Sequence, residues 1–154
     1  MKMKSILALA FLTTLSTAAI CADPLPETGW EVKDGKIMYW HGKVTRTADN
    51  AMEFSGRTYT KRKYIMGENK KLNIKLALQG KGATIAMYIY DKSGTWLGTI
   101  NTTRIPNAEQ TKDFDIVFNL PEKKMKNKAP FSFRIVLEAP KACKVSKFSM
   151  TLDK

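Results

Sequence analysis

The amino-acid sequence predicts an all-β protein, a two-sheet antiparallel β-sandwich of about nine or ten short strands. Apolar and polar residues alternate along most of the chain, and no stretch of 12 or more residues has apolar positions at helical spacing. Glycine, proline, aspartate and asparagine separate the alternating runs. So many short strands bury their apolar sides only by stacking two sheets face to face, and a closed barrel is the lesser alternative.

The strand runs follow one another in the middle and at the end of the chain. In each run every second residue is apolar, as a sheet with one covered face requires. Turn residues lie between the runs, for example at Gly67, Gly80 to Gly82, Ser93 to Gly94, and at Pro121 and Pro130 around a basic segment. The clearest apolar sets are Leu72, Ile74, Leu76, Leu78; Ile85, Met87, Ile89; Phe114, Ile116, Phe118, Leu120; Phe131, Phe133, Ile135, Leu137; and Phe148, Met150, Leu152.

The first 22 of the 154 residues have the order of a secretory signal peptide. Lys2 and Lys4 precede an apolar run from Ile6, and small residues continue to Ala22. The run is too short to span a membrane, which takes about 20 apolar residues. We therefore expect a secreted or periplasmic protein, with cleavage after residue 22 or, as an alternative, after Ala19. A lipid anchor at Cys21 is a further alternative, which Ile20 in front of it disfavours.

The remaining chain predicts an extended segment over residues 23–28 and one domain over residues 29–154, since about 130 residues suit a single core. Without its leader the chain has Cys143 as its one cysteine, so no intrachain disulfide is expected and Cys143 is interpreted as a small buried hydrophobe. Without Lys2 and Lys4, 24 basic residues face 14 acidic ones, a formal charge of +10. Such a balance favours encounters with polyanions.

The segment Gly80 to Gly98 has a strand ending in Tyr90-Asp91, then a glycine turn and Trp96. This order resembles an element of the carbohydrate-binding modules of the galactose-binding-like superfamily, and the likeness to a cellulose-binding-type module extends across residues 28–152. The resemblance implies a jelly roll and a binding function. Such modules often end in an Asp-rich strand that holds calcium, but the matching positions here are Val145 to Phe148 and include Lys147, so no metal site is expected.

No set of residues in the sequence points to catalysis. The carboxylates follow no motif that would pair them across a bond. His41 is the single histidine, and no nucleophile elbow accompanies it. One histidine and one cysteine cannot complete a zinc shell. We therefore expect a protein that is not an enzyme and that needs neither cofactor nor metal.

Aromatic side chains on an exposed face can bind sugar, because a flat ring covers the apolar face of a pyranose while polar neighbours bind its hydroxyls. If Ile85, Met87 and Ile89 point inward, Tyr88 and Tyr90 point outward. The same alternation turns Lys75, Arg134, Glu138 and Lys147 outward. The expected ligand-binding residues, on one shallow face with a basic fringe, are Tyr88, Tyr90, Trp96, Arg134, Lys75 and Lys147.

Alternatives stay open at these positions. Tyr88 and Tyr90 can be half-buried strand residues under a loop, Trp96 can be a hairpin plug, and Trp30 and Trp40 are interpreted as core. A site at the loop ends would instead use His41, Trp40, Asp49, Asn50 and Trp96.

The sequence thus favours a secreted, non-catalytic glycan-binding module, with the positive charge favouring an acidic polysaccharide. The alternative is a structural or protein-interaction sandwich of the periplasm or cell surface. No nucleic-acid partner and no membrane span are expected.

Overall fold

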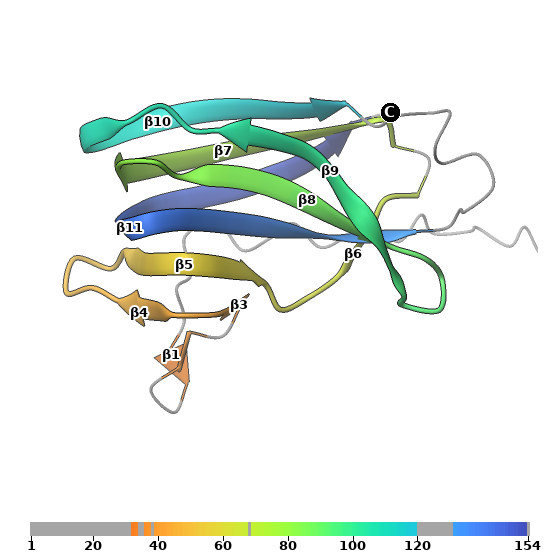
Figure 1. Ribbon diagram of the computed structural model, residues 1–154, viewed down its shortest axis with the longest axis horizontal. Coiled ribbons are helices and arrows are strands. Elements are labelled where there is room, and N and C mark those ends of the chain that lie inside the picture. The colour runs from red at the N-terminus through yellow and green to blue at the C-terminus, as the bar shows by residue number, and fades with distance from the viewer. Residues whose placement is uncertain (1–31, 34–35, 38, 68, 120–130, 154) are drawn as a thin grey trace, which may run out of the picture.

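The computed structural model describes residues 32–33, 36–37, 39–67, 69–119 and 131–153, and the predicted signal peptide and extended segment lie outside them. Within these residues the chain is all-β and contains no helix, as the sequence predicts (Figure 1). No described segment is a helix long and apolar enough to cross a membrane. The strands are β1 (Val32–Lys33), β2 (Lys36–Ile37), β3 (Trp40–His41), β4 (Val44–Arg46), β5 (Met52–Thr60), β6 (Tyr64–Ile65), β7 (Lys71–Gly80), β8 (Thr84–Tyr90), β9 (Trp96–Arg104), β10 (Ala108–Asn119) and β11 (Ser132–Asp153).

Nine of these strands form one antiparallel hydrogen-bonded sheet that folds over into two layers, while β1 and β2 pair separately. The β8 layer contains β9, β8, the first part of β11, the end of β5, β3 and β6. The β7 layer contains β10, β7, the last part of β11, the start of β5 and β4. The outward surfaces of these layers are called the β8 face and the β7 face below.

β11 runs through both layers, and it is one strand where the sequence predicts two. The sequence predicts two separate strands, over Phe131 to Leu137 and Phe148 to Leu152, but the structure has one strand of 22 residues. Its pairing with β5 is irregular between Ala139 and Cys143, where the strand turns a corner from β8 to β7. Figure 1 shows the two parts of β11, in lighter and darker blue, beside β8 and β7 in turn.

A bulge in β11 keeps its apolar side chains inside both layers. Val145 pairs with Leu78 and Lys147 with Ala77, so Ser146 is an extra residue with no counterpart on β7. Apart from Val136, the buried residues of β11 fall on odd numbers before this point and on even numbers after it. The bulge therefore turns Phe148 and Met150 inward and leaves Lys147 exposed.

The core lies between the two layers and confirms the predicted alternation. Ile85, Met87 and Ile89 of β8 are buried, as are the inward residues of β7 and β11. Trp40 of β3 meets Phe148 of β11 edge to face at 5.3 Å between ring centroids and thereby links the layers. Cys143 is 2% exposed and belongs to the same cluster, as expected of a small hydrophobe.

Candidate functional site

The β8 face gathers aromatic side chains from four neighbouring strands. Strand pairing places Tyr90 opposite Trp96 and His41 opposite Tyr59. Tyr88 and Trp96 lie edge to face with their ring centroids 6.0 Å apart, and His41 and Tyr59 lie at 5.3 Å. Because neighbouring strands are about 4.8 Å apart, residues in register form rows across the sheet. The face is therefore an aromatic surface that runs from β9 to β3.

Two cations lie among these rings. The Arg134 guanidinium is 5.3 Å from the ring of Tyr59 and 5.7 Å from that of Tyr90. The ammonium of Lys63 lies 3.9 Å from the Tyr90 ring centroid and donates a hydrogen bond of 3.0 Å to the carbonyl of Gly94. Both distances to Tyr90 are in the range of cation–π contacts. Tyr90 thus lies between two positive charges, and its side chain stays partly exposed.

Arg134 differs from the other arginine of this face in its electrostatic surroundings. Arg57 binds Glu138 through Nη2 at 3.0 Å and Nε at 3.1 Å, and the pKa of Arg57 is raised by this hydrogen bond, by Tyr88 and by the charge of Glu138. Among the described residues, no ion pair includes Arg134, and its buried Nε has no hydrogen-bond partner. No acidic residue in the described part of the chain therefore pairs with the charge of Arg134, and a guanidinium forms strong charge-assisted hydrogen bonds with anionic groups.

The positive charges of this face also affect the pKa of His41. Its pKa is lowered first by partial desolvation and then by the positive charges of Lys61 and Arg134. A neutral imidazole is therefore favoured at neutral pH. The ring lies beside Tyr59 and extends the aromatic surface to β3.

The turn between β8 and β9 places Trp96. The Asp91 carboxylate oxygen Oδ1 accepts hydrogen bonds from the Ser93 and Thr95 amides, both at 2.9 Å, and from the Ser93 hydroxyl at 2.5 Å. The pKa of Asp91 is lowered chiefly by its bond from Ser93. Trp96 leaves this turn with 58% of its surface exposed, so it is an open ring and not a hairpin plug.

The structure brings together four of the six residues expected to form one face. Tyr88, Tyr90, Trp96 and Arg134 share the β8 face. Lys75 and Lys147 do not join them, because they lie on β7 and on the second part of β11 and point outward from the β7 layer. The expectation of a single face with both lysines as its fringe is therefore wrong.

The residues proposed for a loop-end site are dispersed. Trp40 is 3% exposed and belongs to the core. Asp49 and Asn50 lie in the turn between β4 and β5, where Asp49 binds Thr47 and Lys144. That turn and the β8–β9 turn near Trp96 lie at opposite ends of the sandwich in Figure 1. His41 joins the β8 face instead. The predicted core residue Trp30 lies outside the described residues.

Tyr59, Arg57 and Lys63 are residues of the β8 face that the sequence interpretation missed. Thr58 and Thr60, the inward neighbours of Tyr59, are fully buried but polar. They hydrogen-bond the carbonyls of His41 and Arg62. Because these inward residues are polar, the sequence of this part of β5 does not alternate between apolar and polar residues. The β-branched threonines at every second position were the available signal.

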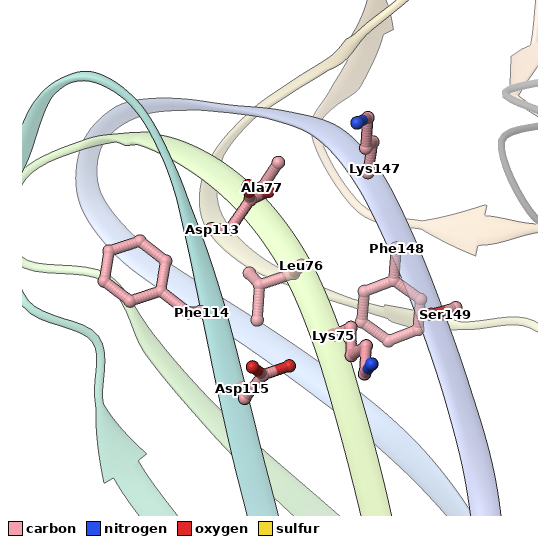
Figure 2. A pocket seen from close by; sticks show the side chains of 9 residues that line it. All are labelled: Lys75, Leu76, Ala77, Asp113, Phe114, Asp115, Lys147, Phe148 and Ser149. Atoms are coloured by element: carbon pink, nitrogen blue, oxygen red, sulfur yellow. The ribbon is translucent and has the colours of Figure 1, made fainter.

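The β7 face carries a separate hollow of about 420 Å³, shown in Figure 2. Three adjacent strands contribute to it. Its lining residues are Lys75, Leu76, Ala77, Asp113, Phe114, Asp115, Lys147, Phe148 and Ser149.

Comparison with known proteins shows the fold. No family model matches the chain, and no curated protein matches it. The structure is similar to the CBM22-1 xylan-binding domain from Paenibacillus barcinonensis Xyn10C, with a TM-score of 0.54 and 15% identity over 89% of this chain and 99% of that domain. It is also similar to the CBM22-1-CBM22-2 tandem domain of Xyn10C, with a TM-score of 0.57 and 14% identity over 90% of this chain and 47% of that one.

Larger structures match as well. The chain spans 24% of an arabinose-bound α-L-arabinofuranosidase and 21% of the active domain of a bacteriophage CBA120 tailspike protein, each with a TM-score of 0.49. The matches to the two Xyn10C structures confirm the antiparallel β-sandwich predicted from the sequence.

Proposed function

We propose that the protein is a secreted or periplasmic glycan-binding module without catalytic activity, and that its binding site is the β8 face. One observation carries the proposal. Exposed or half-exposed rings from β8 and β9 lie beside Arg134, whose charge no acidic residue among those described pairs with. Rings cover the apolar side of a sugar, and a guanidinium binds its oxygens. The match to xylan-binding domains supports the fold on which this site is built.

An acidic polysaccharide fits this face better than a neutral one. Arg134 and Lys63 lie among the tyrosines, whereas the charge of Glu138 is matched by Arg57. A guanidinium binds a carboxylate with two parallel hydrogen bonds, so a uronic acid unit can place its ring on an aromatic side chain and its carboxylate on Arg134. Binding of this kind weakens as the salt concentration rises.

The test is affinity electrophoresis and calorimetry with polygalacturonate and alginate beside neutral xylan and galactan. We expect retention by an acidic polymer that weakens from low to physiological salt. Arg134→Ala should reduce affinity about 10- to 150-fold, since a charge-assisted hydrogen bond contributes about 1.5–3 kcal/mol. Trp96→Ala should reduce it about fivefold, from about 1 kcal/mol of ring contact.

Arg46→Ala is the matched control, because it removes the same charge from an exposed position on β4. Equal losses for Arg46→Ala and Arg134→Ala would show a nonspecific charge effect. No retention of any polymer at low salt would refute the proposal.

A protein partner is the second candidate, and Ile65 favours it. This side chain is 62% exposed and lies in the same row as Tyr90 and Trp96, since Ser132 of β11 pairs with both Ile65 and Tyr90. An isolated aliphatic group adds to a protein interface but offers no flat ring to a sugar. Ile65→Ser should leave glycan affinity unchanged. A glycan affinity that falls with Ile65→Ser as far as with Trp96→Ala would count against a sugar site.

A further inference from the structure

The hollow on the β7 face is separate from the aromatic β8 face, because it lies on the other layer of the sandwich. Its volume of about 420 Å³ is within the range of about 300–1,000 Å³ typical of small-molecule pockets. β10, β7 and the second part of β11 contribute to it, and Figure 2 shows their side chains around the opening. A site here would be built on three paired strands and not on a loop.

Four charged side chains of opposite sign line this hollow. Asp113 of β10 pairs with Ala77 of β7, which pairs in turn with Lys147 of β11. In the next row, Asp115 pairs with Lys75. Two strand spacings separate the backbones of Asp113 and Lys147 by about 10 Å, with the small side chain of Ala77 between them. The two aspartates therefore line one side of the hollow on β10, while the two lysines lie on the central strand β7 and on β11.

None of these four charged groups forms an ion pair among the residues that the structure describes. The ion pairs among the described residues are Arg57 with Glu138, Lys81 with Glu109, and Lys144 with Asp49. No side-chain hydrogen bond among those residues includes Lys75, Asp113, Asp115 or Lys147 either. Two carboxylates and two ammonium groups are thus available to a ligand, while the side chains of Leu76 and Phe148 point into the core on the other side of this layer.

We propose that the hollow is a second binding site, which takes one uncharged sugar unit. Carboxylates only accept hydrogen bonds and ammonium groups only donate them, whereas each sugar hydroxyl does both. Neighbouring hydroxyls can therefore bind an aspartate and a lysine at once. The charges of the hollow sum to zero, so the site does not select for an anion. This proposal does not depend on the β8 face.

The test uses backbone amide shifts in nuclear magnetic resonance spectra of the full chain carrying Trp96→Ala and Arg134→Ala, which disable the β8 face. The probes are xylohexaose and β-1,4-galactotriose. At least one of them should shift the amides of Lys75, Ala77, Asp113 and Lys147, and the affinity should not change with salt. Asp113→Asn should weaken the binding at least fivefold. Lys71→Met, an exposed change on the same strand β7 outside the hollow, should leave it unchanged.

The outcomes separate the two proposals. Shifts at the hollow without retention of acidic polymer by the unmutated protein would keep this site and refute the function proposed for the β8 face. No shift at the hollow with either neutral probe would overturn the second site. Shifts there that are larger with free glycine, a zwitterion, than with the sugars would also overturn it. Equal losses for Asp113→Asn and Lys71→Met would do the same.

Discussion

Gly80 provides a stability prediction in which backbone strain and steric overlap can be separated. Its φ is +142°, and a Cβ at this position would lie 2.3 Å from the Cys143 sulfur and 2.9 Å from the Cys143 Cβ. Gly98 has the same φ of +142°, yet a Cβ there would meet nothing within 4 Å. The two glycines therefore share the same φ and differ in the contacts that a side chain would make.

Gly98→Ala should cost about 1–3 kcal/mol of unfolding free energy, the strain of a side chain in this conformation. Gly80→Ala should cost about 1–3 kcal/mol more, because the new methyl group overpacks the corner of β11. Cys143→Ala removes the atom nearest to the new methyl group. Combined with Gly80→Ala, it should therefore recover about 1 kcal/mol or more of the unfolding free energy, whereas combined with Gly98→Ala it should recover none.

The measurement is urea unfolding followed by tryptophan fluorescence, to which the buried Trp40 contributes. The three single variants and the two double variants with Cys143→Ala are compared with the unmutated protein at one temperature. Equal costs for Gly80→Ala and Gly98→Ala, or effects of Gly80→Ala and Cys143→Ala that simply add, would refute the steric argument.

The remaining predictions concern pH, the turn and the core. Because the pKa of His41 is lowered in the folded chain, the unfolded chain binds the proton more readily, so folding stability should fall as pH drops below about 6.5. His41→Gln should remove that part of the stability–pH profile in thermal melts, and an unchanged profile would contradict it. Asp91→Asn should speed hydrogen exchange at the Ser93 and Thr95 amides and weaken binding through Trp96. The lowered pKa of Asp91 means that the stabilisation of this turn is present above pH 3.8 and is lost as pH falls through the lower folded value, which amide exchange against pH can check. Phe133→Ala, at a fully buried position, should cost about 3–5 kcal/mol in urea unfolding, and a cost below 1 kcal/mol would place Phe133 outside the core.

Alternation along the chain was sufficient to predict the fold class and the orientation of most side chains. In β8, three aliphatic residues at every second position fix which way Tyr88 and Tyr90 point, whatever strands lie beside them. The same reasoning correctly turned Arg134 and Lys147 outward. These predictions succeed because inward and outward are local properties of a strand.

The layer to which an outward residue belongs depends on long-range strand pairing, and the sequence reasoning placed Lys75 and Lys147 on the wrong layer. Lys75 and Lys147 point outward, as expected, but from the β7 layer, because β11 turns its corner between Arg134 and Lys147. Pro140 and Ala142 near the corner read like an ordinary hairpin turn between two strands. Assigning the two parts of β11 to different layers requires the long-range pairing with β8 and β7.

Tyr59 was missed for a different reason. Its strand β5 buries threonines where a typical strand buries aliphatic residues, and buried hydroxyl groups are tolerated there because each one has a hydrogen bond to a carbonyl. A pattern of hydrophobicity cannot detect such a strand.

The extra residue Ser146 marks a place where this strand can change its length. Deleting it would leave Val145, Lys147 and Phe148 opposite Leu78, Ala77 and Leu76 in regular alternation, so Lys147 would still face water and Phe148 the interior. A residue inserted or deleted after Lys147 would instead turn the following apolar side chains to the other face of the sheet. Homologous chains can therefore differ by one residue at Ser146, whereas the spacing from Phe148 onward should be kept even when the residues themselves have diverged.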